Sequence, residues 1–248
     1  MQDEVGITEW LGRTIDPLRD PWYRFGRVLA TLRKCSAVPS GAKWLDVGCQ
    51  MGQFLKVAAE NFGVTACGID DFEECDVVDV CRRYLNLQVG QATDIFDGSW
   101  RYFPRKIDRV GFALDEKFDF ISALEVLEHL VDTDAFIEEC RHHLVDKGWL
   151  IITTPNINSL RNRVMVPFGR YPSGLEYRTI NHHVRLYNAA ALRSHLASHG
   201  FEPIKMEGVS FLPHRALGGR AIRRIDHRLS ELFPPLCGDL IAVFRREN

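Results

Sequence analysis

The stretch KWLDVGCQMGQF at residues 43–54 decides the fold of this chain of 248 residues. It combines a short apolar run ending at Val47, a turn containing Gly48 and Gly52, and the start of a helical pattern. Glycine permits a tight turn and a close approach of the backbone to a ligand. Asp46 at the strand end can hold a ligand amine or fix the turn. The stretch therefore predicts a strand, a ligand-binding turn and a helix, at a spacing that differs from the dinucleotide pattern G-x-G-x-x-G.

The alternation of strand and helix continues on both sides of this stretch. Pro39 to Gly41 end a helix expected over 22–38, and Gly63 suits the C-terminal cap of a helix over 53–62. Further helices are expected over 76–85 and 133–144. Strands are expected over 43–48, 64–69, 87–92, 118–124, 148–154, 202–209 and 240–244. This order predicts an α/β fold in one domain, with a doubly wound, mostly parallel seven-stranded sheet and helices on both faces.

Four segments depart from this alternation. The domain, residues 1–248, is expected to carry an N-terminal helical extension over 1–42, a lengthened connection over 97–117, a lid-like insertion over 155–188 and a basic insertion over 211–235. The lid-like insertion holds five arginines against Glu176, and the basic insertion holds five arginines against two acidic residues. The formal net charge of the whole chain is -2, so nucleic acid is not favoured as a partner. The basic insertions instead predict an acceptor with a phosphate or carboxylate.

Composition indicates the compartment. Seven cysteines are scattered without a CxxC pair, which is typical of free thiols in a reducing compartment. The acidic Met1–Glu4 start differs from a signal peptide, and no apolar run has the length of a membrane span. We therefore expect a cytoplasmic protein. Residues 217–233 interleave apolar residues with arginine, which fits either a solvated helix face or peripheral contact with an anionic membrane.

Asp70 is the second candidate ligand residue. It ends the predicted strand over 64–69, about 20 residues after the glycine turn, as in nucleotide sites of related folds. A carboxylate there can accept both ribose hydroxyls of an adenosine. The other interpretation is a turn residue, because aspartate is favoured in turns.

Taken in order, these segments resemble the class I S-adenosylmethionine (SAM)-dependent methyltransferases. The matching pieces are Leu45-Asp46-Val47-Gly48-Cys49 with Gly52, Gly68-Ile69-Asp70, Phe118–Ile121 with Glu125–Leu130, Leu144–Asn156 and, more weakly, His183–Tyr187 to Gly200-Phe201. The resemblance is nearest to the branch of ubiquinone-biosynthesis, sugar and natural-product O-methyltransferases. It implies SAM as the cofactor, held by Asp46, Gly48, Cys49, Gly52, Asp70, Asp71, Thr93, Asp94 and Glu125. Gln50 replaces a usual glycine, which predicts a wider turn, and Gln91 replaces a usual acid, for which Asp94 can substitute.

Three polar residues follow the predicted strand over 118–124. If the segment is helical, Glu125, Glu128 and His129 share one face. Histidine near neutral pKa can take a proton from a substrate hydroxyl, so His129 and Glu128 are the catalytic candidates. The other interpretation is that Glu128 and His129 cap and orient a helix beside the cofactor. His182, His183, Arg185 and Tyr187, at the end of the lid-like insertion, are the substrate-binding candidates.

A metal site is the alternative for the same residues. Two carboxylates and an imidazole suit several divalent ions, and Glu125, Glu128, His129 and His183 (or His182) would form such a set. This arrangement resembles the small-RNA 3′-end 2′-O-methyltransferases. Metal-free relatives share the same residues after the strand that corresponds to 118–124, so the favoured expectation is that no metal is bound.

Three functions follow from these alternatives. The favoured one is methyl transfer from SAM to a hydroxyl of a small molecule, a glycan or a lipid-linked sugar. The second is a metal-dependent RNA 2′-O-methyltransferase. The third is a module that binds SAM without turnover.

Overall fold

The computed structural model describes residues 9–10, 13–14, 21–36, 38–50, 52–70, 100–104, 107, 111–172, 183–212 and 220–248. The helix expected over 76–85 and the strand expected over 87–92 lie outside the described residues. Four site candidates lie outside them as well: Asp71, Thr93, Asp94 and His182.

A sheet of seven strands forms the centre of the chain. Its strands, in spatial order, are β5 (Trp100–Pro104), β4 (Thr65–Asp70), β3 (Lys43–Val47), β6 (Phe118–Leu124), β7 (Leu144–Pro155), β9 (Asp239–Arg246) and β8 (Phe201–Val209). The first five are parallel, whereas β9 is antiparallel to both neighbours. The strand order reverses between β3 and β6, so the crevice for a ligand lies at their carboxyl ends. The predicted doubly wound α/β fold is confirmed.

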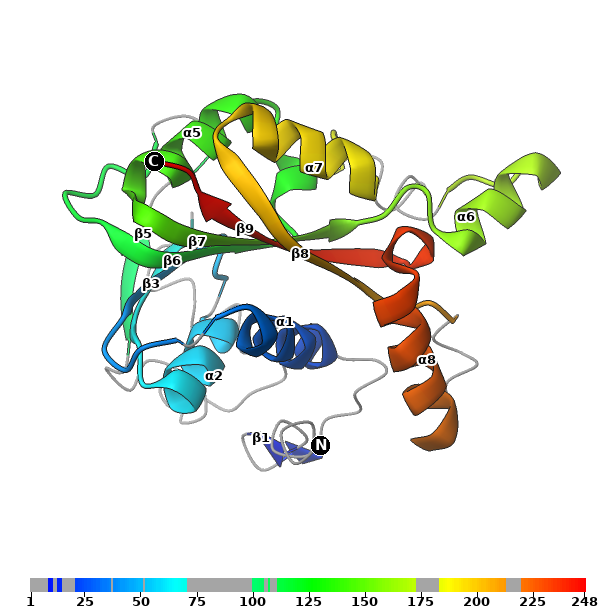
Figure 1. Cartoon of the computed structure of the whole chain (residues 1–248), viewed down its shortest axis with the longest axis horizontal. Coiled ribbons are helices and arrows are strands. Elements are labelled where there is room, and N and C mark those ends of the chain that lie inside the picture. Colours follow the sequence, from blue (N-terminus) through cyan, green and yellow to red (C-terminus); the bar gives the residue numbers. More distant parts are fainter. Residues whose placement is uncertain are drawn as a thin grey trace.

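Helices cover both faces of this sheet, as Figure 1 shows. On one face lie α1 (Pro21–Cys35) and α2 (Gln53–Phe62), and on the other lie α5 (Thr133–His143) and α7 (Ala189–Ser198). The short α6 (Leu160–Met165) follows β7 and extends away from the sheet, and α8 (Arg220–Leu232) precedes β9. Three 3-10 turns, η1 (Leu127–His129), η2 (Val166–Phe168) and η4 (Pro234–Leu236), and a two-stranded ribbon, β1 (Glu9–Trp10) with β2 (Arg13–Thr14), complete the described elements.

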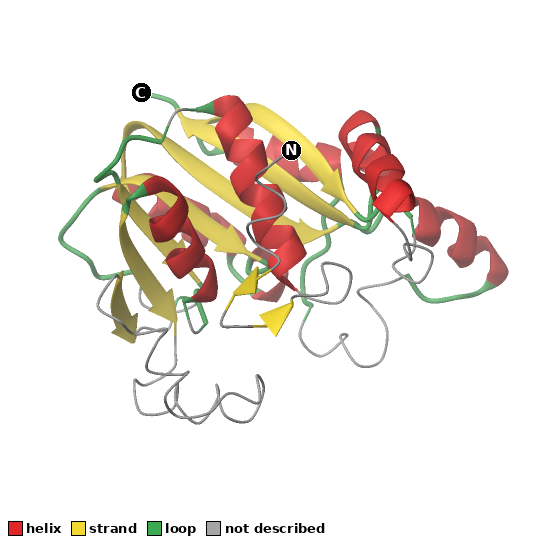
Figure 2. Cartoon of the chain, turned by 90° about the horizontal axis from the view of Figure 1, so that it is seen from below, coloured by secondary structure: helices red, strands yellow, loops and turns green. Residues whose placement is uncertain are grey.

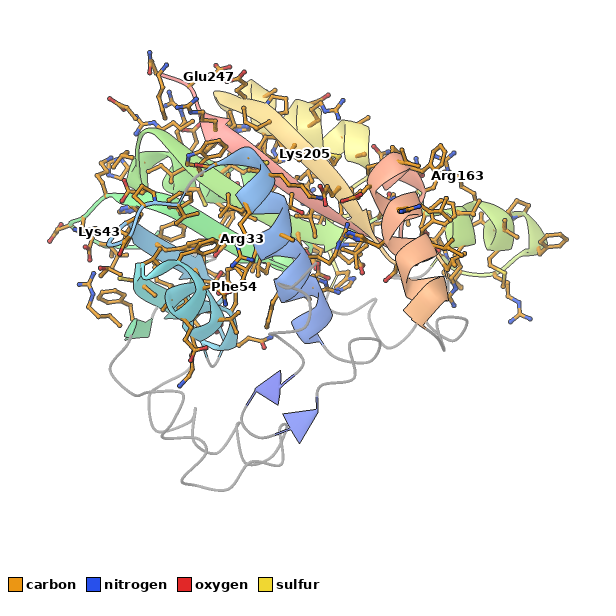
Figure 3. The ribbon with its side chains drawn as sticks, turned by 60° about the horizontal axis from the view of Figure 1, so that its bottom comes forward. Arg33, Lys43, Phe54, Arg163, Lys205 and Glu247 are labelled. Atoms are coloured by element: carbon orange, nitrogen blue, oxygen red, sulfur yellow. The ribbon has the colours of Figure 1, made fainter. Side chains whose placement is uncertain are left out.

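The face under α1 and α2 is packed with aromatic rings. Trp44 of β3 stacks on Phe120 of β6 at 5.2 Å between ring centroids and meets Phe54 of α2 edge-on at 5.7 Å. Figure 2 shows α1 and α2 from their own side of the sheet. Figure 3 shows Arg33 of α1 and Phe54 of α2 near the junction of these helices, where Arg33 donates to Asn61 and covers the ring of Phe62. Burial of these rings fixes α2, and with it the glycine turn that precedes α2.

A buried ion pair anchors α1 to the other end of the sheet. Arg27 lies 3.2 Å from Glu207 of β8, and both side chains are almost fully buried. Thr31 and Lys34 also donate to the Glu207 carboxylate, at 2.9 and 3.0 Å. Because all three donors come from α1, they hold this helix over β8 and leave its first turn beside the carboxyl end of β6.

Some expected boundaries were wrong. The first helix ends at Cys35 rather than at residue 38, and β7 begins at Leu144, four residues before the expected start. The neighbour of β4 is β5, within the segment expected to be a connection. This edge strand, WRYFP, mixes a basic residue and a proline with aromatic residues, so it lacks the apolar run of a buried parallel strand. Among the described helices, none combines the length and the apolar character needed to cross a membrane.

Candidate active site

The glycine turn between β3 and α2 has left-handed backbone at three positions. Gly48, Gln50 and Gly52 have φ values of 72°, 48° and 73°. The amides of Gly48 and Cys49 both donate to the carbonyl of Ile69, at 2.8 and 3.1 Å, so the turn folds over the end of β4. Gln50 adopts the conformation that glycine adopts more easily, at a cost of about 1–2 kcal/mol.

Two contacts make this turn tight. A Cβ placed on Gly48 would lie 2.5 Å from Cγ2 of Val126, which follows β6. The Cys49 thiol is buried and lies where a Cβ on Gly68 of β4 would be. Cys49 is therefore a packing residue through its side chain, and only its backbone remains a candidate for contact with the cofactor.

Asp70 orients the same turn. The amide of Gln50 donates to Oδ2 of Asp70 at 2.7 Å, and Asp70 is the last residue of β4. The carboxylate thus lies at the carboxyl end of β4 beside the turn. This position suits acceptance of ribose hydroxyls, and it also explains why the turn keeps its shape around Gln50.

Asp46 is buried inside the sheet. Ser122 of β6 donates to Asp46 Oδ1 at 2.5 Å and accepts from the indole nitrogen of Trp44 at 2.9 Å. Burial raises the pKa of Asp46 to about 8, although the Ser122 hydrogen bond opposes that rise. Of the two roles expected for this residue, the contacts favour fixing the strand end that carries the turn.

Glu125 lies at the end of β6 on left-handed backbone, with φ 58°. Its amide and its carboxylate both bond to the Thr153 hydroxyl, at 3.1 and 2.9 Å. Arg24 of α1 lies 3.1 Å from Glu125 Oε2 and 3.4 Å from Asp239. Burial raises the pKa of Glu125 to about 7, and the charge of Arg24 limits the rise.

Glu128 is buried three residues further on, in η1. Thr154 donates to Glu128 Oε2 at 3.2 Å, whereas Oε1 has no hydrogen-bond partner within the part of the chain that the structure describes. Burial and the nearby charge of Glu125 raise the pKa of Glu128 to about 8. The Glu128 carbonyl accepts from the amides of Val184 and Arg185, which brings the end of the lid-like insertion to η1.

His129 and His183 meet at this junction. Their ring centroids lie 4.8 Å apart at an interplanar angle of 79°. One ligand atom from each of Glu128, His129 and His183 lies within 4.8 Å of the other two, so these three can hold a divalent ion. Glu125 is outside this group, because η1 is a single 3-10 turn and the expected shared helical face does not form.

The other two substrate-binding candidates have partners near α5 and α7. Arg185 donates to the carbonyl of Val131, and the buried Tyr187 bonds through its hydroxyl to His195 at 2.9 Å. The backbone of Tyr187 forms an isolated bridge with Asn156 after β7. Both residues thus support the segment that carries His183.

Sequence reasoning missed Arg24, Thr153 and Thr154. Thr153 and Thr154 stand at the carboxyl end of β7, so the rule that ligands bind at strand ends could have identified them. Arg24 is one of several basic residues in an amphipathic helix, and nothing in the local pattern sets it apart.

Comparisons with known proteins identify the family of this chain. Residues 22–206 match the family model described as a methyltransferase domain. The mitochondrial ubiquinone biosynthesis O-methyltransferase of Bos taurus is 28% identical over 217 residues, which are 85% of this chain and 55% of the bovine protein. The ubiquinone biosynthesis O-methyltransferase of Thiobacillus denitrificans is 27% identical over 199 residues, covering 80% of this chain and 77% of that protein. The chain thus spans about half the length of the bovine relative.

Solved structures share the fold. Phosphoethanolamine N-methyltransferase 2 of Haemonchus contortus, in complex with S-adenosyl-L-methionine, superposes with a TM-score of 0.56 at 17% identity, over 90% of this chain and 52% of that one. The expected resemblance to class I SAM-dependent methyltransferases is confirmed, and the chain belongs to the methyltransferase domain family.

Proposed function

We propose that this chain transfers the methyl group of SAM to a hydroxyl of a small molecule or of a lipid-linked or glycan acceptor. One observation carries the proposal. Gly48 of the cofactor turn lies directly against Val126, the residue before the turn that holds Glu128 and His129. A cofactor on the glycine turn is therefore adjacent to the two catalytic candidates.

The cofactor contacts follow from the turn. Asp70 would accept the ribose hydroxyls of SAM, the backbone of Gly48 to Gly52 would line the cofactor, and Glu125 would lie at the switch point between β3 and β6. The sulfonium of SAM is already an activated electrophile, so the chain has to bind, align and exclude water.

His129 would take the acceptor proton. SAM held at the glycine turn would supply the methyl group to the acceptor oxygen, and S-adenosylhomocysteine would be the product. The hydroxyl proton passes to His129, which is solvent-exposed and so can reach a substrate. With a pKa raised to about 8, Glu128 is largely protonated at neutral pH, and it would stabilise the imidazolium of His129 fully only where it ionises, above about pH 8. Oxygen as the acceptor atom is favoured by the relatives named as O-methyltransferases.

The lid-like insertion favours an acceptor held at an anionic, apolar surface. Its described parts, residues 155–172 and 183–188, hold four arginines and no acidic residue. Large apolar side chains on α6 and just after it are exposed: Leu160, Val164, Val166, Phe168 and Tyr171. Figure 3 shows Arg163 on this projecting helix. Apolar side chains flanked by arginines suit an anionic membrane, and the same holds for residues 217–233, where Ile225, Leu232 and Phe233 are exposed.

The RNA alternative is less well supported. The relatives are named for ubiquinone biosynthesis, and Glu125 stands apart from the three residues that can hold a metal. Whether Glu128, His129 and His183 bind a metal is a separate question for the same site. Measuring activity with and without a chelator answers it.

The proposal is tested with radiolabelled SAM and the full chain. We expect SAM to bind, Asp70→Ala to weaken binding by at least tenfold, and a small-molecule or lipid fraction of a cell extract to gain the label. No measurable binding of SAM would overturn the enzyme proposal. Label in the RNA fraction, lost on chelation, would favour the alternative instead.

A further inference from the structure

A second cluster of metal-ligating side chains lies outside the candidate active site, between α5 and α7. It consists of Asp134 in the first turn of α5, His195 on α7, and His199, the residue directly after α7. Figure 1 shows both helices on the same face of the sheet. One ligand atom from each residue lies within 4.8 Å of the other two.

The distances suit a small tetrahedral ion. Nε2 of His195 lies 2.6 Å, and Nε2 of His199 lies 3.6 Å, from Oδ1 of Asp134. Ligands about 2.0–2.1 Å from a tetrahedral zinc ion are roughly 3.3 Å apart. The two observed distances bracket that value, so each ligand atom has to move by less than about 1 Å.

In both histidines the ring nitrogen that faces away from Asp134, Nδ1, already has a hydrogen-bond partner. Nδ1 of His199 lies 3.0 Å from the backbone carbonyl of His195. Because a carbonyl only accepts, this nitrogen carries a proton, and Nε2 is the ring atom that faces Asp134. Nδ1 of His195 lies 2.9 Å from the Tyr187 hydroxyl. Histidines that bind metals are usually held in this way, through the other ring nitrogen.

The charges around the cluster select the kind of ion. The hydrogen bond from His195 holds the pKa of Asp134 below its usual value, and His199 and Arg185 act in the same direction. One carboxylate beside the positive charge of Arg185 is a poor site for calcium or magnesium, which need several oxygen ligands. Two imidazoles suit zinc and its neighbours among the transition metals.

We propose that Asp134, His195 and His199 bind a structural transition-metal ion, such as zinc, that joins α5 to α7. On binding, the ion replaces the proton between His195 and Asp134. This proton moves to Nδ1 of His195, where the Tyr187 oxygen accepts it, and any proton on Nε2 of His199 passes to solvent. The exposed side of Asp134 leaves room for water as a fourth ligand. The ion would fix Tyr187 and, through it, the segment whose amides bond to Glu128.

The test uses the full chain without an affinity tag and with both histidines of the first cluster changed, as His129→Gln with His183→Gln. We expect this variant to bind one equivalent of Co²⁺, seen by visible absorption, and to release it to Zn²⁺. Adding Asp134→Asn or His199→Gln should weaken Co²⁺ binding by at least tenfold, whereas His142→Gln on α5 should not. Asp134 is exposed, so its substitution keeps the fold.

A second readout follows the consequence for structure. Zn²⁺ should raise the thermal midpoint and slow hydrogen exchange at the amides of Val184 and Arg185, and Asp134→Asn should remove both effects. The proposal is overturned if the chain with the first cluster removed binds no Co²⁺, or binds it equally well with Asp134→Asn. The cluster would then serve only as an ion pair that joins α5 to the end of α7. Activity with SAM is not needed for either readout.

Discussion

Arg24 of α1 lies 3.1 Å from the carboxylate of Glu125, which stands on left-handed backbone at the end of β6. The N-terminal extension therefore reaches the candidate active site, with Asp239 of β9 as a second partner of Arg24. The contact places a positive charge against a partly buried carboxylate at the point where the strand order reverses.

Arg24→Met tests that contact. Arg24 lowers the pKa of Glu125, which burial otherwise raises. Without the guanidinium, this pKa should rise further above about 7, by roughly one unit or more. We expect the pH midpoint of SAM binding, measured by calorimetry between pH 6 and 9, to move upward. Arg33→Met, on the same helix but away from the site, is the control, and an unchanged midpoint in Arg24→Met would separate Glu125 from cofactor binding.

His129→Gln tests the proposed base. General base catalysis contributes about 10²–10⁴-fold, so kcat should fall by that range while the Kd for SAM stays within about twofold. His142→Gln changes an exposed histidine of α5 and should retain activity. If kcat and SAM affinity fall together, His129 supports the cofactor pocket instead.

Glu207→Gln tests how firmly α1 is held. Removing this charge leaves Arg27 buried without its partner, which costs about 3–5 kcal/mol. We expect urea denaturation to show a loss of that order in the free energy of unfolding. Glu202→Gln, at an exposed position of the same strand, should change it by less than about 0.5 kcal/mol. A similar result for both variants would mean that the buried pair does not hold the helix.

Much of the fold could be predicted because its signals are local. The helix over Gln53–Phe62 and the strand over Phe118–Leu124 have the predicted bounds. Gly63 takes the left-handed cap conformation, and the strand is mostly apolar, with Asp119 and Ser122 as its polar residues. The strand β5, which has β4 as its one neighbour within the described residues, was missed because it lacks an apolar run.

The candidate site also contains residues that local sequence patterns predict and residues that they do not. Gly48, Asp70 and Glu128 follow strands that could be recognised, so the sheet brings them to one edge. Arg24 could not be predicted, because its meeting with Glu125 depends on how α1 packs across the sheet. The prediction that Glu125 and His129 share a helical face was wrong. Glu125 itself has left-handed backbone and turns the chain at the end of β6, before η1 begins.

Asp46→Asn tests how the ionisation of Asp46 makes the free energy of unfolding depend on pH. Burial raises the folded pKa of Asp46 to about 8, far above the value of about 3.9 in an unfolded chain. The group therefore stabilises the fold fully below about pH 4, and this contribution is lost as pH rises through about 8. The amide does not titrate, so the variant should be more stable than the wild type at pH 8–9, without cofactor, on the order of a few kcal/mol. Parallel curves of unfolding free energy against pH would contradict this.

Gly48→Ala tests the contact between the glycine turn, residues 48–52, and Val126, the residue before η1. The new Cβ would need left-handed backbone, which costs about 1–2 kcal/mol, and would lie 2.5 Å from Val126 Cγ2. The clash should displace η1, so kcat and SAM affinity should both fall by at least tenfold. Adding Val126→Ala removes the clashing methyl but not the backbone strain, so it should restore most of the lost kcat. Gln50→Gly, which relieves strain in the same turn without a clash, should retain SAM affinity. Failure of Val126→Ala to restore activity would show that the backbone of Gly48, rather than its contact with Val126, couples the two turns.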